Sequence, residues 1–249
     1  MSEDYKEAFE RTRVAGSIAA GALDEVAKII KPGIKTNKID EVCYNFIKDH
    51  GAYSAPLFYR GFPKSCCTST NHIVCHGIPS DKILNEGDIV NVDVTAFKDG
   101  WHGDTSRTFE IGEISVKAKK LVKTTHDAMM NAIKIVKENI YLGDIGATIQ
   151  SYVEAKGFSV VQDFCGHGIG QTFHKEPNVL HYGEKGTGEK IKAGMIFTIE
   201  PMINLGNYET KLLNDGWTAV TKDKTLSAQF EHTIGVTKDG YEIFTLSKN

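Results

Sequence analysis

The sequence predicts an α+β fold in which two similar halves, each built from helices followed by strands, share one core. Three observations support this prediction. Apolar residues recur at helical spacing in some segments, and polar and apolar residues alternate in others. The chain also repeats itself weakly, at a shift of 106 to 107 positions.

The first two helices are expected near the N-terminus. One runs from about Asp4 to Ile30, and Pro32 prevents it from continuing. The other is indicated by apolar residues at positions i, i+3, i+4, i+7 and i+8, which are Ile39, Val42, Cys43, Phe46 and Ile47. Asn37 can cap this second helix and Gly51 can end it.

The repeat links these helices to the second half of the chain. A similar apolar pattern ends at Gly157 and comprises Ile145, Ile149, Tyr152 and Val153. A shift of 106 positions matches Lys28 with Lys134, Ile29 with Ile135, Ile34 with Ile140 and Gly51 with Gly157. In the strands that follow, a shift of 107 places Asp93 on Glu200. An acidic residue therefore recurs at the same place in each half.

Length and composition indicate a soluble globular protein. The 249 residues suit one large domain or two small ones. We expect a single domain over residues 1–249, with halves of about 1–114 and 115–249. The hydrophobic content of 41% and the charged content of 24% are ordinary. A formal charge of −3 gives no sign of a nucleic-acid partner, and no run of 18 or more apolar residues could span a membrane.

The N-terminal residues and the cysteines favour a cytoplasmic location. The first residues, MSEDYKEAFERTR, are densely charged and have no apolar centre, so they do not form a signal peptide. The five cysteines are odd in number and irregularly spaced, which fits reduced thiols. Cys66, Cys67, Cys75 and His76 cluster without a paired C-x-x-C pattern, so we do not expect structural zinc there.

Two acidic residues lie in one expected hairpin, between Asn91 and Asp104. Strands disfavour aspartate, so a carboxylate there is unusual. Alternation puts Asp93 on one face of its strand with Asn91 and Thr95, opposite a valine-rich face. A four-residue turn at 97–100 would place Asp93 directly opposite Asp104. The simplest alternative is an ordinary antiparallel sheet with its polar side toward water.

Two more expected strands carry acidic residues, Glu200 in FTIEP and Glu231 in QFEHTI. Each shares its strand face with other polar residues, which are Thr198, Gln229 and Thr233. Carboxylates close together repel, and one would have to stay protonated. The four carboxylates carry about −4, which two divalent cations would neutralise.

Three histidines could join a metal site or contact a substrate. His167 and His174 lie in CGHGIGQTFHKEP, and His76 lies in CHGIP. Glycines around His167 allow close backbone approach or positive φ. The alternative is a glycine-rich loop with incidental histidines, because any one of the three alone is more often an ordinary hydrogen-bonded residue.

Seven motifs appear in order between residues 74 and 234: VCHGIP, NVDV, HGDTSRTF, CGHGIG, FHKEP, FTIEPM and QFEHTI. With these motifs the chain resembles the type I methionine aminopeptidases of bacteria and organelles. The resemblance implies the pita-bread fold, a curved antiparallel sheet flanked by helices with pseudo-twofold halves. It also implies that the single domain is catalytic.

The resemblance further implies a set of metal ligands for two divalent ions: Asp93, Asp104, His167, Glu200 and Glu231. Asp104 and Glu231 would bridge both ions, Asp93 would complete one, and His167 with Glu200 would complete the other. Oxygen-rich ligation with one imidazole suits manganese, iron or cobalt and tolerates zinc. Two ions about 3.5–4 Å apart can hold a bridging water and lower its pKa.

The resemblance assigns other residues to the substrate. His76 would position the peptide, His174 would donate to the oxyanion, and Glu200 would carry a proton to the leaving amine. The pocket for the methionine side chain would comprise Tyr59, Phe62, Cys67, Phe173 and Trp217. Each aromatic residue could instead serve core packing, and Cys66 could exchange roles with Cys67. A small pocket residue of some relatives falls near Pro56.

The expected function is removal of the N-terminal methionine from nascent proteins whose second residue is small and uncharged (Gly, Ala, Ser, Thr, Cys, Pro or Val). Association with the ribosome would suit such an enzyme, and no apolar stripe requires a second subunit, so we expect a monomer. One alternative is a prolidase or X-Pro aminopeptidase, but those chains carry a large additional N-terminal domain. The other is a non-catalytic binding protein of the same fold, which should lack some of the ligands.

Overall fold

The computed structural model describes residues 5–247, and in that range it contains four α-helices and fifteen strands. The helices are α1 (Lys6–Ile29), α2 (Thr36–Asp49), α3 (Val116–Ile135) and α4 (Leu142–Glu154). The strands of the first half are β1 (Tyr53–Ser54), β2 (Cys67–Thr70), β3 (Ile73–Cys75), β4 (Ile89–Lys98) and β5 (Trp101–Glu110). Those of the second half are β6 (Ser159–Val160), β7 (Gly166–Gly168), β8 (Lys175–Val179), β9 (Ile196–Ile199), β10 (Met202–Asn204), β11 (Thr210–Leu212), β12 (Ala219–Thr221), β13 (Ser227–Gln229), β14 (Glu231–Val236) and β15 (Tyr241–Ile243).

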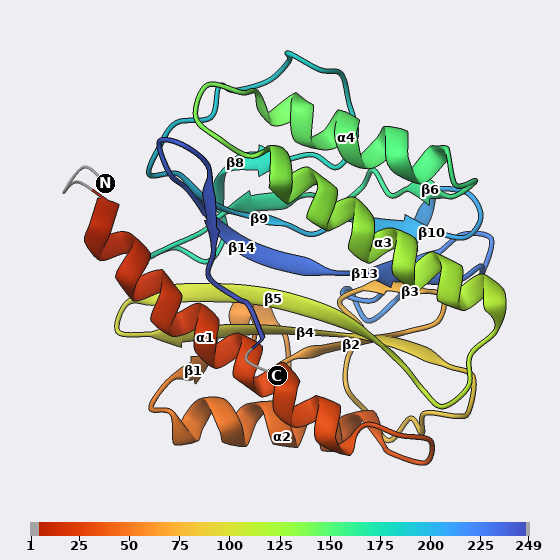
Figure 1. Cartoon of the computed structure of the whole chain (residues 1–249). Coiled ribbons are helices and arrows are strands. Elements are labelled where there is room, and N and C mark those ends of the chain that lie inside the picture. The colour runs from red at the N-terminus through yellow and green to blue at the C-terminus, as the bar shows by residue number, and fades with distance from the viewer. Residues whose placement is uncertain (1–4, 248–249) are drawn as a thin grey trace.

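A curved sheet of nine strands, whose paired strands are antiparallel, forms the centre of the molecule (Figure 1). Its order is β1-β4-β5-β14-β9-β7-β8, with β2 also beside β4 and β15 also beside β14. Two three-stranded sheets, β13-β10-β6 and β11-β12-β3, adjoin it. The predicted α+β class and the curved antiparallel sheet flanked by helices are confirmed.

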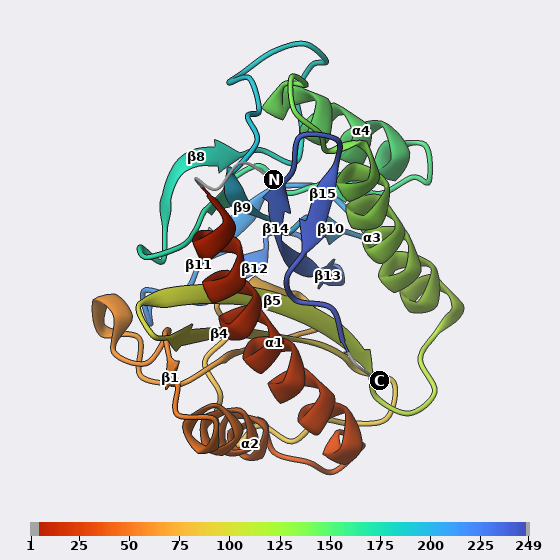
Figure 2. The same ribbon diagram turned by 60° about the vertical axis from the view of Figure 1, so that its left-hand side comes forward.

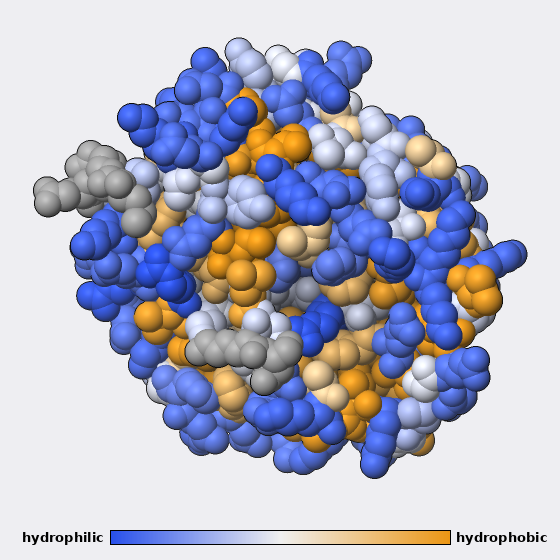
Figure 3. All heavy atoms as spheres, in the orientation of Figure 1, coloured by the Kyte–Doolittle hydropathy of each residue, from blue (hydrophilic) through white to orange (hydrophobic). Residues whose placement is uncertain are grey.

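The helices lie in two pairs, one over each half of the sheet (Figures 1 and 2). One apolar cluster joins α1 and α2 to the valine-rich face of β4, and a second joins α3 and α4 to Phe197 and Ile199 of β9. Because side chains alternate along a strand, Asp93 and Thr198 face the opposite side of the sheet. On the face shown in Figure 3, hydrophilic residues dominate around the edge, as expected of helix surfaces that face solvent, and hydrophobic residues are exposed in patches between them.

The element boundaries follow the internal repeat. The first helix of each half ends at Ile29 or Ile135, 106 positions apart, and the second helix begins at Thr36 or Leu142, again 106 apart. The strands β4 and β9, which lead to the acidic residues, begin 107 positions apart. Among residues 5–247, no helix combines the length and the hydrophobicity that a transmembrane span requires.

Two local predictions differ from the structure. Asn37 does not cap α2, because the helix begins one residue earlier, at Thr36. The Thr36 hydroxyl and the Asn37 N–H both bond to the carbonyl of Ser80, so contacts with the segment around Ser80 determine where the helix starts. Asp4, the expected start of the first helix, lies outside the described residues.

The hairpin register is the second difference. Lys98 pairs with Trp101, so the turn has only two central residues, Asp99 and Gly100. Both have positive φ, 48° and 85°, which matches the tight turn that an Asp-Gly pair favours. This shorter turn shifts the register by two residues, and Asp104 lies opposite Thr95 rather than opposite Asp93.

Candidate active site

All twelve residues that the sequence analysis assigned to the site line one cavity of about 370 Å³: Tyr59, Phe62, Cys67, His76, Asp93, Asp104, His167, Phe173, His174, Glu200, Trp217 and Glu231. The cavity opens on the side of the sheet that faces away from the helices, since its strand acids point to that side. The structure therefore brings together residues that are up to 172 positions apart, from Tyr59 to Glu231.

A row of paired residues across four strands places three of the acids. Cys67 of β2 pairs with Asp93, Asp93 with Ser106, and Ser106 with Glu231 of β14. Asp104 lies two residues along β5 from Ser106, so its side chain points to the same face. Asp93 and Asp104 are thus diagonal neighbours on that face.

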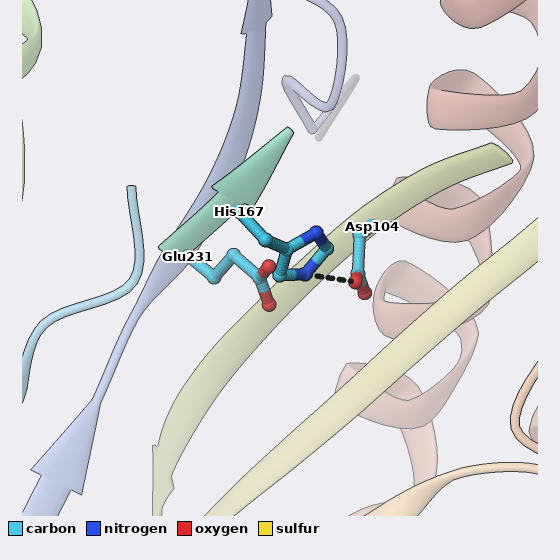
Figure 4. Close-up of side chains that lie close together, drawn as sticks. All are labelled: Asp104, His167 and Glu231. Carbon is cyan, nitrogen blue, oxygen red and sulfur yellow. Dashed lines mark ion pairs between the residues drawn. The ribbon is translucent and has the colours of Figure 1, made fainter. Parts of the chain in front are cut away.

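His167 of β7 and Glu200, directly after β9, complete the acidic group. The Nε2 atom of His167 lies 3.6 Å from Oδ2 of Asp104 and 3.6 Å from Oε1 of Glu200. Potential ligand atoms of Asp104, His167 and Glu231 all lie within 4.8 Å of one another, and the three residues are buried. Figure 4 shows these three side chains converging from three different strands.

Glycines on either side of His167 allow its strand to fit between two neighbours. A Cβ atom at Gly166 would collide with the carbonyl of Thr198, and one at Gly168 with the carbonyl of Glu176. Close backbone approach, one of the two roles considered for these glycines, is therefore the one that the structure shows.

Hydrogen bonds orient two of the carboxylates. The Thr95 hydroxyl donates to Oδ1 of Asp104 at 2.7 Å, and the Thr198 hydroxyl donates to Oε1 of Glu200 at 2.8 Å. Nε2 of Gln229 donates to the other oxygen of Glu200 at 3.4 Å. Sequence reasoning gave no role to these three residues, although their positions on the acidic strand faces were a usable signal.

Aromatic side chains form the walls of the cavity. The rings of Tyr59 and Phe173 are 4.9 Å apart, and those of Phe62 and Trp217 are 5.2 Å apart in an edge-to-face arrangement. These rings, with Cys67, give one side of the cavity an apolar and sulfur-containing lining.

The two remaining histidines lie between these walls and the acids. Nδ1 of His174 is 3.1 Å from the hydroxyl of Tyr59, and its ring lies 4.2 Å from that of His167. Desolvation and the neighbouring His167 lower the pKa of His174 to about 4. The ring of His76 lies edge-on to Trp217, and burial lowers the pKa of His76 as well. Both rings are therefore neutral at pH 7.

Comparison with known proteins identifies the family of the chain. The profile of metallopeptidase family M24 matches residues 10–238. The chain belongs to metallopeptidase family M24. Within it, methionine aminopeptidase from Rickettsia prowazekii (strain Madrid E) is 58% identical over 240 residues, which cover 96% of this chain and 93% of that relative.

Solved structures agree with the fold. The crystal structure of methionine aminopeptidase from Rickettsia prowazekii is 57% identical, covers 97% of this chain and 98% of its own, and superimposes with a TM-score of 0.96. Prolidase from Pyrococcus furiosus, at 22% identity, has a TM-score of 0.78, and the match covers 98% of this chain and 65% of that chain. This second likeness shows the common fold alone.

The electrostatics of the site fit the metal dependence of family M24. Burial and the charge of Asp104 raise the pKa of Asp93 and of Glu231 well above their usual range. Burial raises the pKa of Glu200 to about 7, although His167 opposes this effect. Burial lowers the pKa of His167, but a hydrogen bond to Asp104 and the charge of Glu200 outweigh it and raise that pKa.

Within residues 5–247, His167 is the only basic side chain closer than 4.0 Å to the four carboxylates. One imidazole cannot neutralise four carboxylates, of which Asp104 and Glu231 are buried and Asp93 and Glu200 are partly buried, so the group is electrostatically incomplete without cations. Carboxylate oxygens with a single imidazole are a donor set that divalent metals such as manganese, iron and cobalt accept. The residues of the chain therefore fit the metal that the family name implies.

The neighbouring cysteines have separate surroundings. Cys67 and Cys75 line the cavity, whereas Sγ of Cys66 faces Asp40 at 3.8 Å within the core under α1 and α2. Cys67 is the first residue of β2 and Cys66 directly precedes the strand, so successive side chains in this extended segment point to opposite sides and Cys67 rather than Cys66 lies against the site.

Other cavity residues escaped the sequence analysis: Arg60, Cys75, Asp163, Phe164, Cys165 and Met202. Arg60 and Asp163 are exposed at the rim, where no local pattern distinguishes them from ordinary surface charges. Pro56 also lines the cavity, where a small pocket residue was considered.

Proposed function

We propose that this chain removes the N-terminal methionine from nascent proteins whose second residue is small and uncharged. The observation that carries the proposal is the convergence of four carboxylates and one imidazole beside an aromatic cavity, in a chain 58% identical to a methionine aminopeptidase. The cavity of about 370 Å³ suits one amino-acid side chain and the first peptide bond rather than a folded segment.

The residues that would hold two divalent ions, of cobalt, manganese, iron or zinc, are Asp93, Asp104, His167, Glu200 and Glu231. Asp104 and Glu231 would bridge, because Asp104 is central among the acids and Glu231 adjoins it. Asp93 would complete one ion, and His167 with Glu200 would complete the other, which agrees with their 3.6 Å contact. When bound, the ions polarise the scissile carbonyl and make a water acidic near neutral pH.

The protein's own groups would move protons and stabilise charge. Glu200 would carry a proton to the leaving amine, a role that a positioned carboxylate can perform. The hydroxyl of Tyr59 can donate to Nδ1 of His174 at 3.1 Å, which leaves the ring hydrogen on Nε2. That N–H would donate to the carbonyl oxygen as negative charge develops on it.

The cavity would also select the substrate. Phe62, Cys67 and Trp217 would contact the methionine side chain, together with Tyr59 and Phe173. His76 would position the peptide beyond the scissile bond and would limit the size of the second residue. We propose that the chain acts as a monomer in the cytoplasm, where nascent N-termini emerge, and that association with the ribosome would place it near its substrates.

A panel of peptides tests this function. The metal-loaded chain should release methionine from Met-Ala-Ser and should leave Ala-Pro and acetyl-Met-Ala-Ser intact. Cleavage of Ala-Pro in preference to Met-Ala-Ser would indicate a prolidase-type enzyme instead. Cleavage of no peptide, with metals bound, would indicate a binding protein of the same fold.

A further inference from the structure

His181 is a fully buried histidine that contacts Glu200 from behind the site. It lies two residues after the end of β8, and it is 0% exposed. Its Nε2 atom accepts a hydrogen bond from the backbone N–H of Glu200 at 3.2 Å. It does not line the cavity, so it cannot contact a substrate there.

The N–H of Glu200 needs such a partner because β9 ends just before this residue. Ile199 is the last residue of β9 that pairs with β14, and Pro201 has no N–H to continue a ladder. The chain then enters β10, which belongs to a different sheet. A buried N–H without a partner would destabilise the fold, and the hydrogen bond to the imidazole prevents this.

The hydrogen bond also determines the state of the ring. A nitrogen that accepts an N–H carries no hydrogen, so in the neutral ring the hydrogen is on Nδ1. Nδ1 is buried and has no hydrogen-bond partner among residues 5–247. A hydrocarbon side chain would fill this space without leaving a buried donor unpaired. Packing alone therefore does not account for a histidine here, whereas the contact with Glu200 does.

Helix α4 fixes the position of His181 on the side that faces away from the site. Gly146 of α4 lies directly against the residues before and after His181. A Cβ atom at Gly146 would collide with the carbonyl of Tyr182 and crowd that of Leu180. Oε1 of Gln150, on the same helix, accepts from the N–H of Gly183 at 3.0 Å. The backbone around His181 thus packs against α4, while its ring contacts Glu200, the residue that follows β9.

We propose that His181 is a positioning residue for Glu200. It holds the backbone of Glu200, while Thr198 and Gln229 hold the carboxylate, so that the carboxylate meets His167 at 3.6 Å. The proposal rests on the assignment of Glu200 as a metal ligand and proton carrier. A fixed backbone would preserve that geometry, and partners one step beyond the ligands commonly change metal affinity or activity by about 10–100-fold.

Three substitutions at one position test the proposal. In His181→Gln, the side-chain oxygen can reach the place of Nε2 and accept from Glu200. His181→Asn is polar but too short to reach, and His181→Leu fills the space without an acceptor. Each metal-free protein is titrated with Mn²⁺ in a calorimeter, kcat and KM are measured on Met-Ala-Ser at saturating metal, and thermal unfolding without metal serves as the folding control.

We expect His181→Asn and His181→Leu to lose about 10–100-fold in Mn²⁺ affinity or kcat, with little change in KM, and His181→Gln to recover most of that loss. Equal impairment of the Gln and Asn variants would overturn the proposal, as would wild-type Mn²⁺ binding and kcat in the Leu variant. Comparison of the Gln variant with the Asn variant tests the positioning role even if the Leu variant does not fold. The calorimetric titration with Mn²⁺ needs no peptide. It therefore tests the role of His181 separately from the proposed peptidase function, which the kinetic assay tests.

Discussion

Thr95 and Asp104 face each other across the β4–β5 hairpin, and the threonine hydroxyl donates to Oδ1 of the aspartate at 2.7 Å. This bond occupies one carboxylate oxygen and leaves the other, Oδ2, 3.6 Å from Nε2 of His167. Asp104 is therefore held in one orientation at the centre of the acidic group, where a ligand shared by two ions would have to lie.

Asp104→Asn should remove methionine release and weaken the binding of both ions. A bridging ligand contributes to two sites, and loss of several kcal/mol of charge stabilisation corresponds to at least about a thousandfold in rate. Peptide hydrolysis and metal analysis of the dialysed protein measure the two effects. Asp163→Asn is the matched control, because Asp163 lines the rim but bonds to Thr210 and is not a proposed ligand. Near-normal turnover of Asp104→Asn at saturating metal would exclude the bridging role.

His174→Ala should retain metal binding and reduce kcat by about two to three orders of magnitude, the usual cost of losing one oxyanion donor. Tyr59→Phe should have a smaller effect in the same direction, since it removes only the hydroxyl that orients Nδ1. Calorimetric titration with Mn²⁺ and steady-state kinetics separate the two properties. If His174→Ala lost metal affinity, His174 would be a ligand rather than a donor to the substrate.

The metal-free chain should become less stable as pH rises from about 5 to about 7. The pKa of Glu200 is raised from its ordinary value of 4.5 to about 7, so the folded state binds more protons than the unfolded state in this range. The contribution of Glu200 to the free energy of unfolding is therefore fully present below pH 4.5 and is lost as pH rises through 7. The effect is about 1.4 kcal/mol for each pKa unit between the two states. Urea unfolding at several pH values measures it.

Glu200→Gln is the control for this pH effect, because it removes one titrating group and should reduce the dependence, while Asp93 and Glu231, whose pKa values are also raised, retain part of it. Added Mn²⁺ should oppose the loss above pH 7, since metal binds the deprotonated ligands. A metal-free stability that rises steadily from pH 5 to pH 7.5 would contradict the raised pKa.

Met-Ala-Ser should be cleaved at least about a thousandfold faster, in kcat/KM, than Met-Glu-Ser, because a clash of about 4 kcal/mol at the second residue lowers transition-state binding directly. The second side chain would lie beside the acidic group and the ring of His76, where a glutamate is both too large and wrongly charged. A competition assay with both peptides, followed by mass spectrometry, gives the ratio of their kcat/KM values. Similar rates for both would refute the steric explanation.

The acidic side chains were predictable from the sequence because strand alternation depends only on local spacing. Asp93, Glu200 and Glu231 each lie on the polar face that alternation assigned to them. The predicted register of the β4–β5 hairpin was wrong because we counted four residues in its turn instead of two. The Asp99-Gly100 pair, with positive φ at both positions, marks a two-residue turn and would have corrected the count.

His181 and the rim residues could not be predicted in the same way. His181 follows β8 within the segment Val179 to Tyr182, where no periodic pattern marks it. Its contact with Glu200 depends on where the second sheet departs from the first, which is a property of the whole fold. Arg60 and Asp163 reach the rim from distant parts of the chain, so only the tertiary structure brings them together.

We propose that five side chains hold two divalent ions at the base of the aromatic cavity. Anomalous scattering from crystals of the chain grown with Mn²⁺ tests this two-ion site most directly. We predict two strong anomalous peaks, both contacted by Asp104 and Glu231, one also by Asp93 and the other by His167 and Glu200. No peak among these residues, or peaks bound by other side chains alone, would contradict the account.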